Sequence, residues 1–178
     1  AYRRYNLNRS IDDYNNDASD EQNYWNENVM PFGEVVYSQT RWERFSWGNQ
    51  GDPNRAPYKY VQETFYNVKP GNVNKFTTFQ RRVGQVFSEA YPDEGRAVVR
   101  LVSGGNAYLF IVFNGFDIYG AENQLDVNFQ SKYDEKFGSG QWDVDFQNML
   151  SSLDYFGTAA IARQTLEFVP ELSTQIGN

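Results

Sequence analysis

The chain has 178 residues, and a chain of this length favours a single domain around one core. Its formal net charge of −7 argues against a nucleic-acid partner, because affinity for phosphates comes from clustered lysine and arginine. The chain has no cysteine and no histidine, which excludes disulfides, thiolate nucleophiles and every mechanism or metal site that depends on imidazole.

Aromatic residues are abundant, with 14 Phe, 13 Tyr and 4 Trp. Such rings suit a core, a stacking surface or an interface. Without histidine and cysteine, any chemistry must use carboxylates or the side chains of Tyr, Lys, Arg, Asn or Trp. We therefore expect no metal and no cofactor.

No apolar run reaches membrane-spanning length, and the chain does not open with a charged segment followed by an apolar one. We expect a soluble protein with no membrane partner. The compartment stays open, since Ala1 fits a cytoplasmic protein that has lost its initiator Met. It equally fits a periplasmic or secreted protein whose signal peptide has been removed.

Residues 1–33 are rich in Asn, Asp and Tyr, and we interpret them as an irregular N-terminal arm. The run 12–20 (DDYNNDASD) offers oxygen ligands of the kind calcium prefers, but it lacks the glycine and the distal glutamate of an EF-hand loop. No metal is expected there. A single domain is predicted over 34–173, followed by a short tail at 174–178.

Two segments have the β-branched and aromatic composition of strands. The first, 34–47 (EVVYSQTRWERFSW), is an extra strand at the start of the domain, and the second is 58–68. Gly and Pro residues interrupt the chain between them, and Pro70 and Gly71 end the second. We expect these two strands to pair as a hairpin through the long loop.

Apolar residues then recur at the three- and four-residue spacing of an amphipathic helix. They are Phe76, Phe79, Val83, Val86 and Ala90. Pro92 and Gly95 predict the end of this helix. The β-rich runs 96–102 and 107–113 follow, and the Ser-Gly-Gly-Asn turn between them predicts a hairpin.

Two helices are predicted over 129–137 and 141–156, separated by glycines, with a last strand over 163–169. From residue 57 onward the predicted order is strand, helix, strand, strand, helical region, strand. This is the βαββαβ order of the ferredoxin-like unit, an α+β fold whose antiparallel sheet has its helices on one face.

Several short features occur in this order over about 57–173. They are Val68-Lys69-Pro70-Gly71, the helical Phe76 and Phe79, and the runs 97–105 (AVVRLVSGG), 109–112 (LFIV), 137–142 (FGSGQW) and 170–173 (PELS). With these features the sequence resembles the dimeric α+β barrel superfamily, a ferredoxin-like group that includes antibiotic-biosynthesis monooxygenase, EthD-like and NIPSNAP-like proteins.

The resemblance implies that the bare face of the sheet packs against a second subunit, so that a homodimer closes a barrel around a small molecule. It also implies an activity like that of a cofactor-free monooxygenase, or of a related enzyme, on an aromatic substrate. The plainer alternative is that these aromatic strands form only the dimer core. The lack of histidine departs from family branches with a catalytic histidine, and it argues against haem degradation and chlorite chemistry.

Candidate site residues come from the strands that would line such a barrel. The candidates for catalysis are Glu63, Tyr60 and Arg100, with Glu63 as a general base if it points into the barrel. The candidates for substrate binding are Trp42, Arg44, Tyr60 and Tyr66. Alternation along the strand places Glu63 on one face and the tyrosines on the other, and either face is open to be the inner one.

A non-enzymatic alternative is a structural or interaction subunit of a larger assembly, with the aromatic arm as its contact surface. The arm residues that favour it are Tyr2, Tyr5, Tyr14, Tyr24 and Trp25. A glycoside hydrolase with paired carboxylates at Asp143 and Asp145 is disfavoured, because positions two apart on a helix point in different directions. Asp143 instead suits the first turn of a helix.

Overall fold

The computed structural model describes residues 23–24, 27–28, 31, 41–45, 56–92, 94–103, 105–119, 128–154 and 161–170. Most of the predicted arm (1–33) and the whole tail (174–178) lie outside these residues, as do the side chains of 41–44 and 103. The backbone divides into two units, Ser38–Phe168 and a second made of Ala1–Tyr37 with Val169–Asn178. The fold described below is that of Ser38–Phe168.

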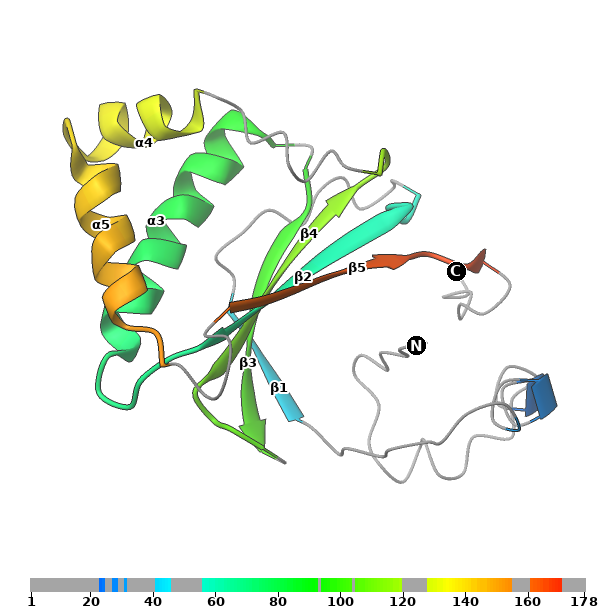
Figure 1. Ribbon diagram of the computed structural model, residues 1–178. Helices are drawn as coiled ribbons and strands as arrows, with labels where there is room; N and C mark the ends of the chain where they lie inside the picture. Colours follow the sequence, from blue (N-terminus) through cyan, green and yellow to red (C-terminus); the bar gives the residue numbers. More distant parts are fainter. Residues whose placement is uncertain are drawn as a thin grey trace. The chain divides into compact units, whose positions relative to one another are not determined.

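The described part of Ser38–Phe168 contains both strands and helices along the chain (Figure 1). In chain order they are β1 (Arg41–Phe45), β2 (Tyr60–Asn67), α3 (Val73–Ala90), β3 (Arg96–Ser103), β4 (Leu109–Phe116), α4 (Phe129–Phe137), α5 (Gln141–Ser151) and β5 (Ile161–Glu167). The α+β class predicted from the sequence is confirmed, as is the order strand, helix, strand, strand, two helices, strand from residue 60 onward.

The sheet has five strands in the order β1-β3-β4-β2-β5, and every neighbouring pair is antiparallel. β3 and β4 form the predicted hairpin. β2 lies between β4 and β5, because α3 carries the chain across the sheet before β3 begins. The four strands β3-β4-β2-β5 and their connections are compatible with a ferredoxin-like fold.

The expected hairpin between the strands of 34–47 and 58–68 is wrong. β1 pairs with β3, not with β2, and β3 and β4 separate β1 from β2 in the sheet. A strand has two hydrogen-bonding edges, and β4 and β5 occupy both edges of β2. The open edge of β3 is therefore the one that β1 uses. The parts of 34–47 on either side of β1 lie outside the described residues.

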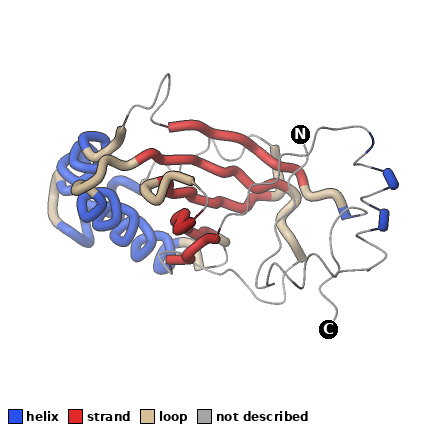
Figure 2. Tube along the Cα trace, turned by 90° about the horizontal axis from the view of Figure 1, so that it is seen from below, coloured by secondary structure: helices blue, strands red, loops and turns tan. Residues whose placement is uncertain are grey.

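The helices lie on one side of the sheet, and the strands extend beyond them at one end (Figure 2). The core between the two layers joins Phe76 of α3 to Phe110 of β4, whose ring centroids are 4.7 Å apart. Its buried members are Val68, Phe76, Phe79, Val98, Phe110, Val112, Met149 and Leu153. These include two of the apolar positions that predicted the first helix.

Side chains of each strand alternate between this helix-facing side and the opposite side. On β2, Tyr66 contacts the Phe76 ring at 5.2 Å between centroids and so faces the helices. Alternation places Tyr60, Gln62 and Thr64 on the same side, whereas Glu63 lies on the opposite side. The sequence left open which side of the sheet these residues of β2 face. The position of α3 decides it.

Helix α5 ends at Ser151, earlier than the predicted 156. The next residues pair with the chain at the C-terminal end of β2. Leu153 forms a β-bridge with Val68, and the amide of Asp154 donates to the Asn67 carbonyl at 2.7 Å. This pairing ends the helix one turn before its apolar pattern stops. Within the part of the chain that the structure describes, no helix has the length and apolarity to cross a membrane.

Candidate functional site

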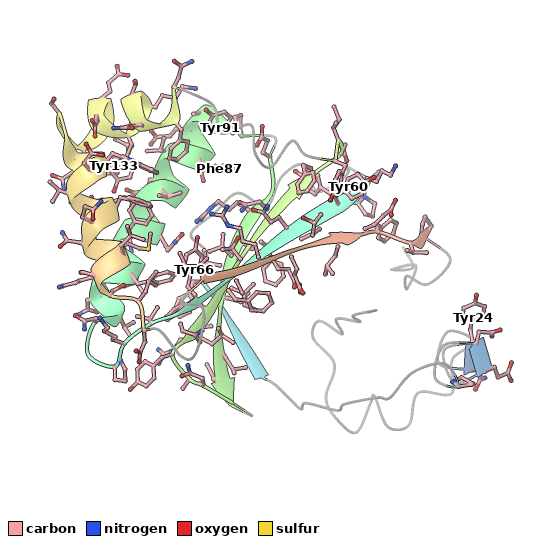
Figure 3. The ribbon with its side chains drawn as sticks, in the orientation of Figure 1. Tyr24, Tyr60, Tyr66, Phe87, Tyr91 and Tyr133 are labelled. Carbon is pink, nitrogen blue, oxygen red and sulfur yellow. The ribbon has the colours of Figure 1, made fainter. Side chains whose placement is uncertain are left out.

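The predicted site residues do not come together in one place. Tyr60 and Tyr66 lie at opposite ends of β2 (Figure 3), on its helix-facing side. Alternation along the strand places Glu63 on the other side of the sheet. A site that combines Glu63 with either tyrosine is therefore ruled out by the sheet itself. The two sides must be considered separately.

Glu63 is fully buried, with 0 % of its surface exposed, and its carboxylate accepts a hydrogen bond from the amide of Gln164 on β5. Its neighbours on that side include Ile111, which is 1 % exposed. Glu63 therefore does not face solvent. A buried carboxylate is retained in a protein when its oxygens are paired, and here an amide donor supplies part of that pairing.

The remaining candidates belong to β3 and β1. Arg100 donates from Nε to the carbonyl of Ala107 at 2.7 Å, and its guanidinium lies 5.7 Å from the ring centroid of Phe110. These contacts bridge β3 and β4. The backbones of Trp42 and Arg44 pair with Leu101 and Val99 of β3, and their side chains lie outside the described residues.

A row of polar side chains crosses four strands on the helix-facing side. The register aligns Arg96 of β3 with Asn114 of β4, Asn114 with Gln62 of β2, and Gln62 with Thr165 of β5. We call Arg96, Asn114, Gln62 and Thr165 the polar row. Removing polar groups from water costs free energy unless they are hydrogen-bonded. We therefore consider the polar row as a candidate binding site.

Arg96 is the most deeply buried member of the polar row, at 6 % exposed. Its guanidinium donates to the side-chain carbonyl of Gln80, which α3 presents at 2 % exposed. Burial lowers the pKa of Arg96 to about 10, while the nearby Tyr66 hydroxyl acts in the opposite direction. The helix and the sheet thus hold a guanidinium at the inner end of the row.

Tyr66 lies between the sheet and the helices (Figure 3). It is four residues along β2 from Gln62 of the polar row. Burial raises its pKa, and the positive charges of Arg163 on β5 and Arg96 on β3 act in the opposite direction.

Tyr60 lies at the end of β2 that is distant from the helices (Figure 3). Two further aromatic rings contact it. Tyr60 stacks on Phe116 with 5.7 Å between ring centroids and meets Tyr119 edge-on at 5.5 Å. Tyr119 is 71 % exposed. We call Tyr60, Phe116 and Tyr119 the aromatic platform. Its open ring surface can stack against a planar molecule.

The polar row and the aromatic platform are adjacent, because Gln62 follows Tyr60 as the next helix-facing residue of β2. Binding sites for small molecules combine apolar or aromatic walls with a few placed polar groups. The arrangement here can hold a ring on the platform and can direct its polar substituent toward the row. It contains hydrogen-bond donors from arginine, amide and hydroxyl side chains.

A second polar cluster lies among the helices and has a structural role. The Asp145 carboxylate accepts hydrogen bonds from the Tyr133 hydroxyl at 2.7 Å, from the Gln141 amide at 3.0 Å and from Arg82. These residues join α3, α4 and α5. Asp145 is buried at 7 % exposed, whereas Asp143 is exposed in the first turn of α5. The predicted divergence of the two carboxylates is thus confirmed.

A groove of ≈ 320 Å³ lies between α3 and α4 and does not include any of these sites. Its lining residues are Val86, Glu89, Ala90, Lys132, Glu135 and Lys136. Lys136 forms an ion pair with Glu89 across it. Among the residues that the structure describes, no three acidic side chains gather in a way that suits a metal ion.

Two positions in the sequence, Gln80 and Arg96, indicate buried polar groups, although neither was predicted to be a site residue. Gln80 lies four residues after Phe76, on the apolar stripe of α3, and a polar residue on such a stripe indicates a buried partner. Arg96 similarly lies two residues before Val98, which is in the core. The partner of each could not be named, because the register between β3, β4 and β2 was unknown.

No protein-family model, no curated protein and no solved structure matches this chain.

Proposed function

We propose that this chain is a ferredoxin-like domain that binds a small aromatic molecule on the helix-facing side of its sheet. The ring of the ligand stacks on the aromatic platform, and its polar substituent reaches the polar row. The observation that carries this proposal is the register that puts four polar side chains next to the half-buried stacked rings of Tyr60 and Phe116. A binding site, more than a hydrophobic core, accounts for both features.

The balance of exposure and burial supports this position for the ligand. Tyr119 and Ile118 are 71 % and 74 % exposed, and large apolar side chains in contact with water favour a partner. Arg96 and Gln80 are instead buried and hold each other in place. Exposed aromatic side chains close to fixed polar groups are a common feature of small-molecule sites.

The homodimer that the resemblance implies is part of this proposal, although the ligand is placed outside the barrel and not within it. The side of the sheet opposite the helices has the half-buried apolar residues Val61, Phe65, Phe113 and Leu166. A second copy that covers them would remove further apolar surface from water at about 25 cal/mol per Å². In this arrangement the ligand sites stay on the outer, helix-facing side of each sheet.

Binding is the function that the geometry supports best, ahead of catalysis. A cofactor-free oxygenation of an aromatic substrate needs a group that takes a proton from it. Glu63 lies on the opposite side of the sheet, and burial raises the pKa of Tyr66, which makes this phenol a weaker source of phenolate. Oxygenation of the bound ligand therefore remains the secondary proposal.

Titration of the full chain with naphthamide, followed by saturation-transfer NMR, tests the site with a neutral aromatic probe. We expect binding that Tyr60→Leu weakens about fivefold, since it removes ring stacking. Tyr91→Leu is the matched control, because Tyr91 is a half-buried tyrosine at the end of α3 that stacks on Phe129 and is not part of the aromatic platform. Equal loss in both variants, or no binding at all, would refute the proposed site.

Native mass spectrometry of the protein from its natural source tests the assembly and looks for a retained ligand. A dimer with a non-covalently bound aromatic compound supports the proposal. A large assembly without a ligand would instead favour the alternative of a structural subunit that uses its aromatic arm. An empty monomer would refute the dimeric barrel.

A further inference from the structure

The strand β5 forms one edge of the sheet (Figure 1). β2 pairs with one side of β5, and no strand among the described residues pairs with its other side. This outer edge is regular, because β5 has 7 residues and its register with β2 runs without a shift. β5 contains neither proline nor lysine, two residues that commonly protect an open edge. An edge of this kind favours pairing with another strand.

The hydrogen bonds between β2 and β5 show which residues direct their backbone groups outward. The amide of Phe168 donates to the Lys59 carbonyl at 2.7 Å, in the register of the β2–β5 pair. In an antiparallel pair, the hydrogen-bonded positions alternate along each strand. Every second residue of β5, counted back from Phe168, therefore bonds toward β2. The residues between them direct their amide and carbonyl groups to the outer edge, and they include Arg163, Thr165 and Glu167.

These outward residues form a self-complementary pattern of charge. Arg163 and Glu167 carry opposite charges and lie equally far from Thr165, on either side of it. In an antiparallel pair of two identical strands, a two-fold axis at Thr165 places each Arg163 opposite a Glu167. Both side chains are exposed and lie on the same side of the strand, so they face each other across such a pair. A shift of two residues in either direction would leave both charges opposite uncharged residues.

The contacts of these two charges within the chain leave them able to pair. Glu167 lies 4.0 Å from Lys59, and both side chains are 58 % exposed, so this ion pair contributes little. Arg163 also acts on Tyr66, and its guanidinium has several N–H donors. The described helices lie toward the other end of β5, where Ile161 pairs with Tyr66 and Tyr66 contacts α3 (Figure 1).

We infer that the outer edge of β5 pairs with the same edge of a second copy of this chain, antiparallel and about a two-fold axis at Thr165. The two sheets then form one continuous sheet, joined by backbone hydrogen bonds. Each Arg163 lies opposite Glu167 of the second copy. This contact uses the edge of a strand, so it depends neither on the aromatic ligand nor on the homodimer through the face of the sheet.

Disulfide cross-linking of the full chain tests the pairing. The chain has no cysteine, so Thr165→Cys supplies a single thiol, and it lies on the proposed axis. Opposed residues there have Cα atoms about 5.5 Å apart, which a disulfide can span. Ala162→Cys is the matched control, because Ala162 is exposed on the same strand and its two copies would lie about 20 Å apart.

Under mild oxidation, Thr165→Cys should form a covalent dimer about tenfold faster than Ala162→Cys or better, since pairing raises the effective concentration of its thiols. Non-reducing gel electrophoresis measures both rates. Equal rates in the two variants would overturn the inference, because the cross-links would then come from random collisions. Absence of a covalent dimer from Thr165→Cys would also overturn it, in favour of a different partner for this edge.

Charge reversal in the Thr165→Cys variant tests the register. Arg163→Glu places like charges opposite each other, so cross-linking should slow about fivefold or more. Adding Glu167→Arg exchanges the two signs and should restore the rate. Lys75→Glu is the control, because it changes the net charge equally at an exposed position of α3 and should leave the rate unchanged.

Equal slowing by Lys75→Glu and Arg163→Glu would overturn the inference, because the effect would then come from net charge. Failure of Glu167→Arg to restore the rate would overturn the proposed register. Binding of naphthamide is measured separately, so a failure of the edge contact leaves the proposed ligand site standing, and a failure of the ligand site leaves the edge contact standing.

Discussion

Two polar clusters lie on the same side of this sheet, and they differ in the elements that supply their side chains. The Asp145 cluster surrounds one carboxylate with three described donors from three helices. The polar row brings together one arginine, two amides and one hydroxyl from the strands, with Gln80 as the described acceptor for Arg96. A cluster whose charges neutralise each other stabilises the fold. The amide and hydroxyl groups of the polar row can both donate and accept hydrogen bonds, which suits the polar substituent of a ligand.

The largest effect should come from breaking the matched cluster. We expect Asp145→Ala to lower the free energy of unfolding by about 3 kcal/mol, because it leaves Arg82 and the buried Tyr133 hydroxyl without their acceptor. Urea denaturation measures this loss. Asp143→Ala, an exposed change on the same helix, should stay within about 0.5 kcal/mol of the wild type. Similar losses of unfolding free energy in the two variants would contradict a stabilising role for the Asp145 cluster.

The pH dependence of the stability that the Asp145 cluster provides follows from the direction of the Asp145 pKa shift. Burial opposes the charge of Asp145, but hydrogen bonds from Tyr133, Arg82 and Gln141 outweigh it and hold its pKa below the usual value. A lowered carboxyl pKa stabilises the fold above the unfolded value of 3.8, and this stabilisation is lost as the pH falls through the folded value.

The advantage of the wild type over Asp145→Asn should therefore be constant near neutral pH and should shrink below about pH 4. Urea denaturation at a series of pH values measures it. An advantage that grows on acidification would show that the carboxylate is not the stabilising form.

A smaller effect on stability is expected from the polar row. Arg96→Met replaces a guanidinium whose charged form is disfavoured by burial, and it leaves Gln80 without that donor. These changes oppose each other, so the free energy of unfolding should change by about 1 kcal/mol or less. Binding of naphthamide should also weaken, because Arg96 is a member of the polar row. A loss of stability as large as that of Asp145→Ala would make the row structural.

The smallest effect on stability is expected at the aromatic platform. Tyr119 is 71 % exposed, so Tyr119→Ala should change the free energy of unfolding by about 0.5 kcal/mol or less. The same variant should weaken the binding of naphthamide, because one ring of the platform is lost. Val144→Ala, a 55 % exposed apolar residue on α5, serves as the control and should leave binding unchanged.

Local patterns predicted the individual elements well. The apolar spacing around Phe76 and Phe79 predicted α3, and both residues are in the core. The Ser-Gly-Gly-Asn turn predicted the pairing of β3 with β4. In each case the interacting positions are close in sequence, so that periodicity or turn chemistry is sufficient. The early end of α5 departs from its pattern because Leu153 pairs with the distant Val68.

Pairing over long distances was not predictable in the same way. β1 has the composition of a strand, yet nothing in it indicates that its partner is β3 and not β2. The candidate residues Tyr60, Tyr66 and Glu63 were identified as strand positions, and their division between the two sides of the sheet depended on where α3 packs. The partnership of Arg96 with Gln80 likewise depends on how α3 crosses β3.

The sequence by itself determined the class of this protein: an acidic chain without histidine or cysteine, rich in aromatic residues, with the element order of an α+β domain. Only the tertiary structure decided which polar residues meet. The alignment of Arg96, Asn114, Gln62 and Thr165 arises from the register of three separate strand pairs. A shift of one residue in any pair would turn those side chains to the opposite side of the sheet.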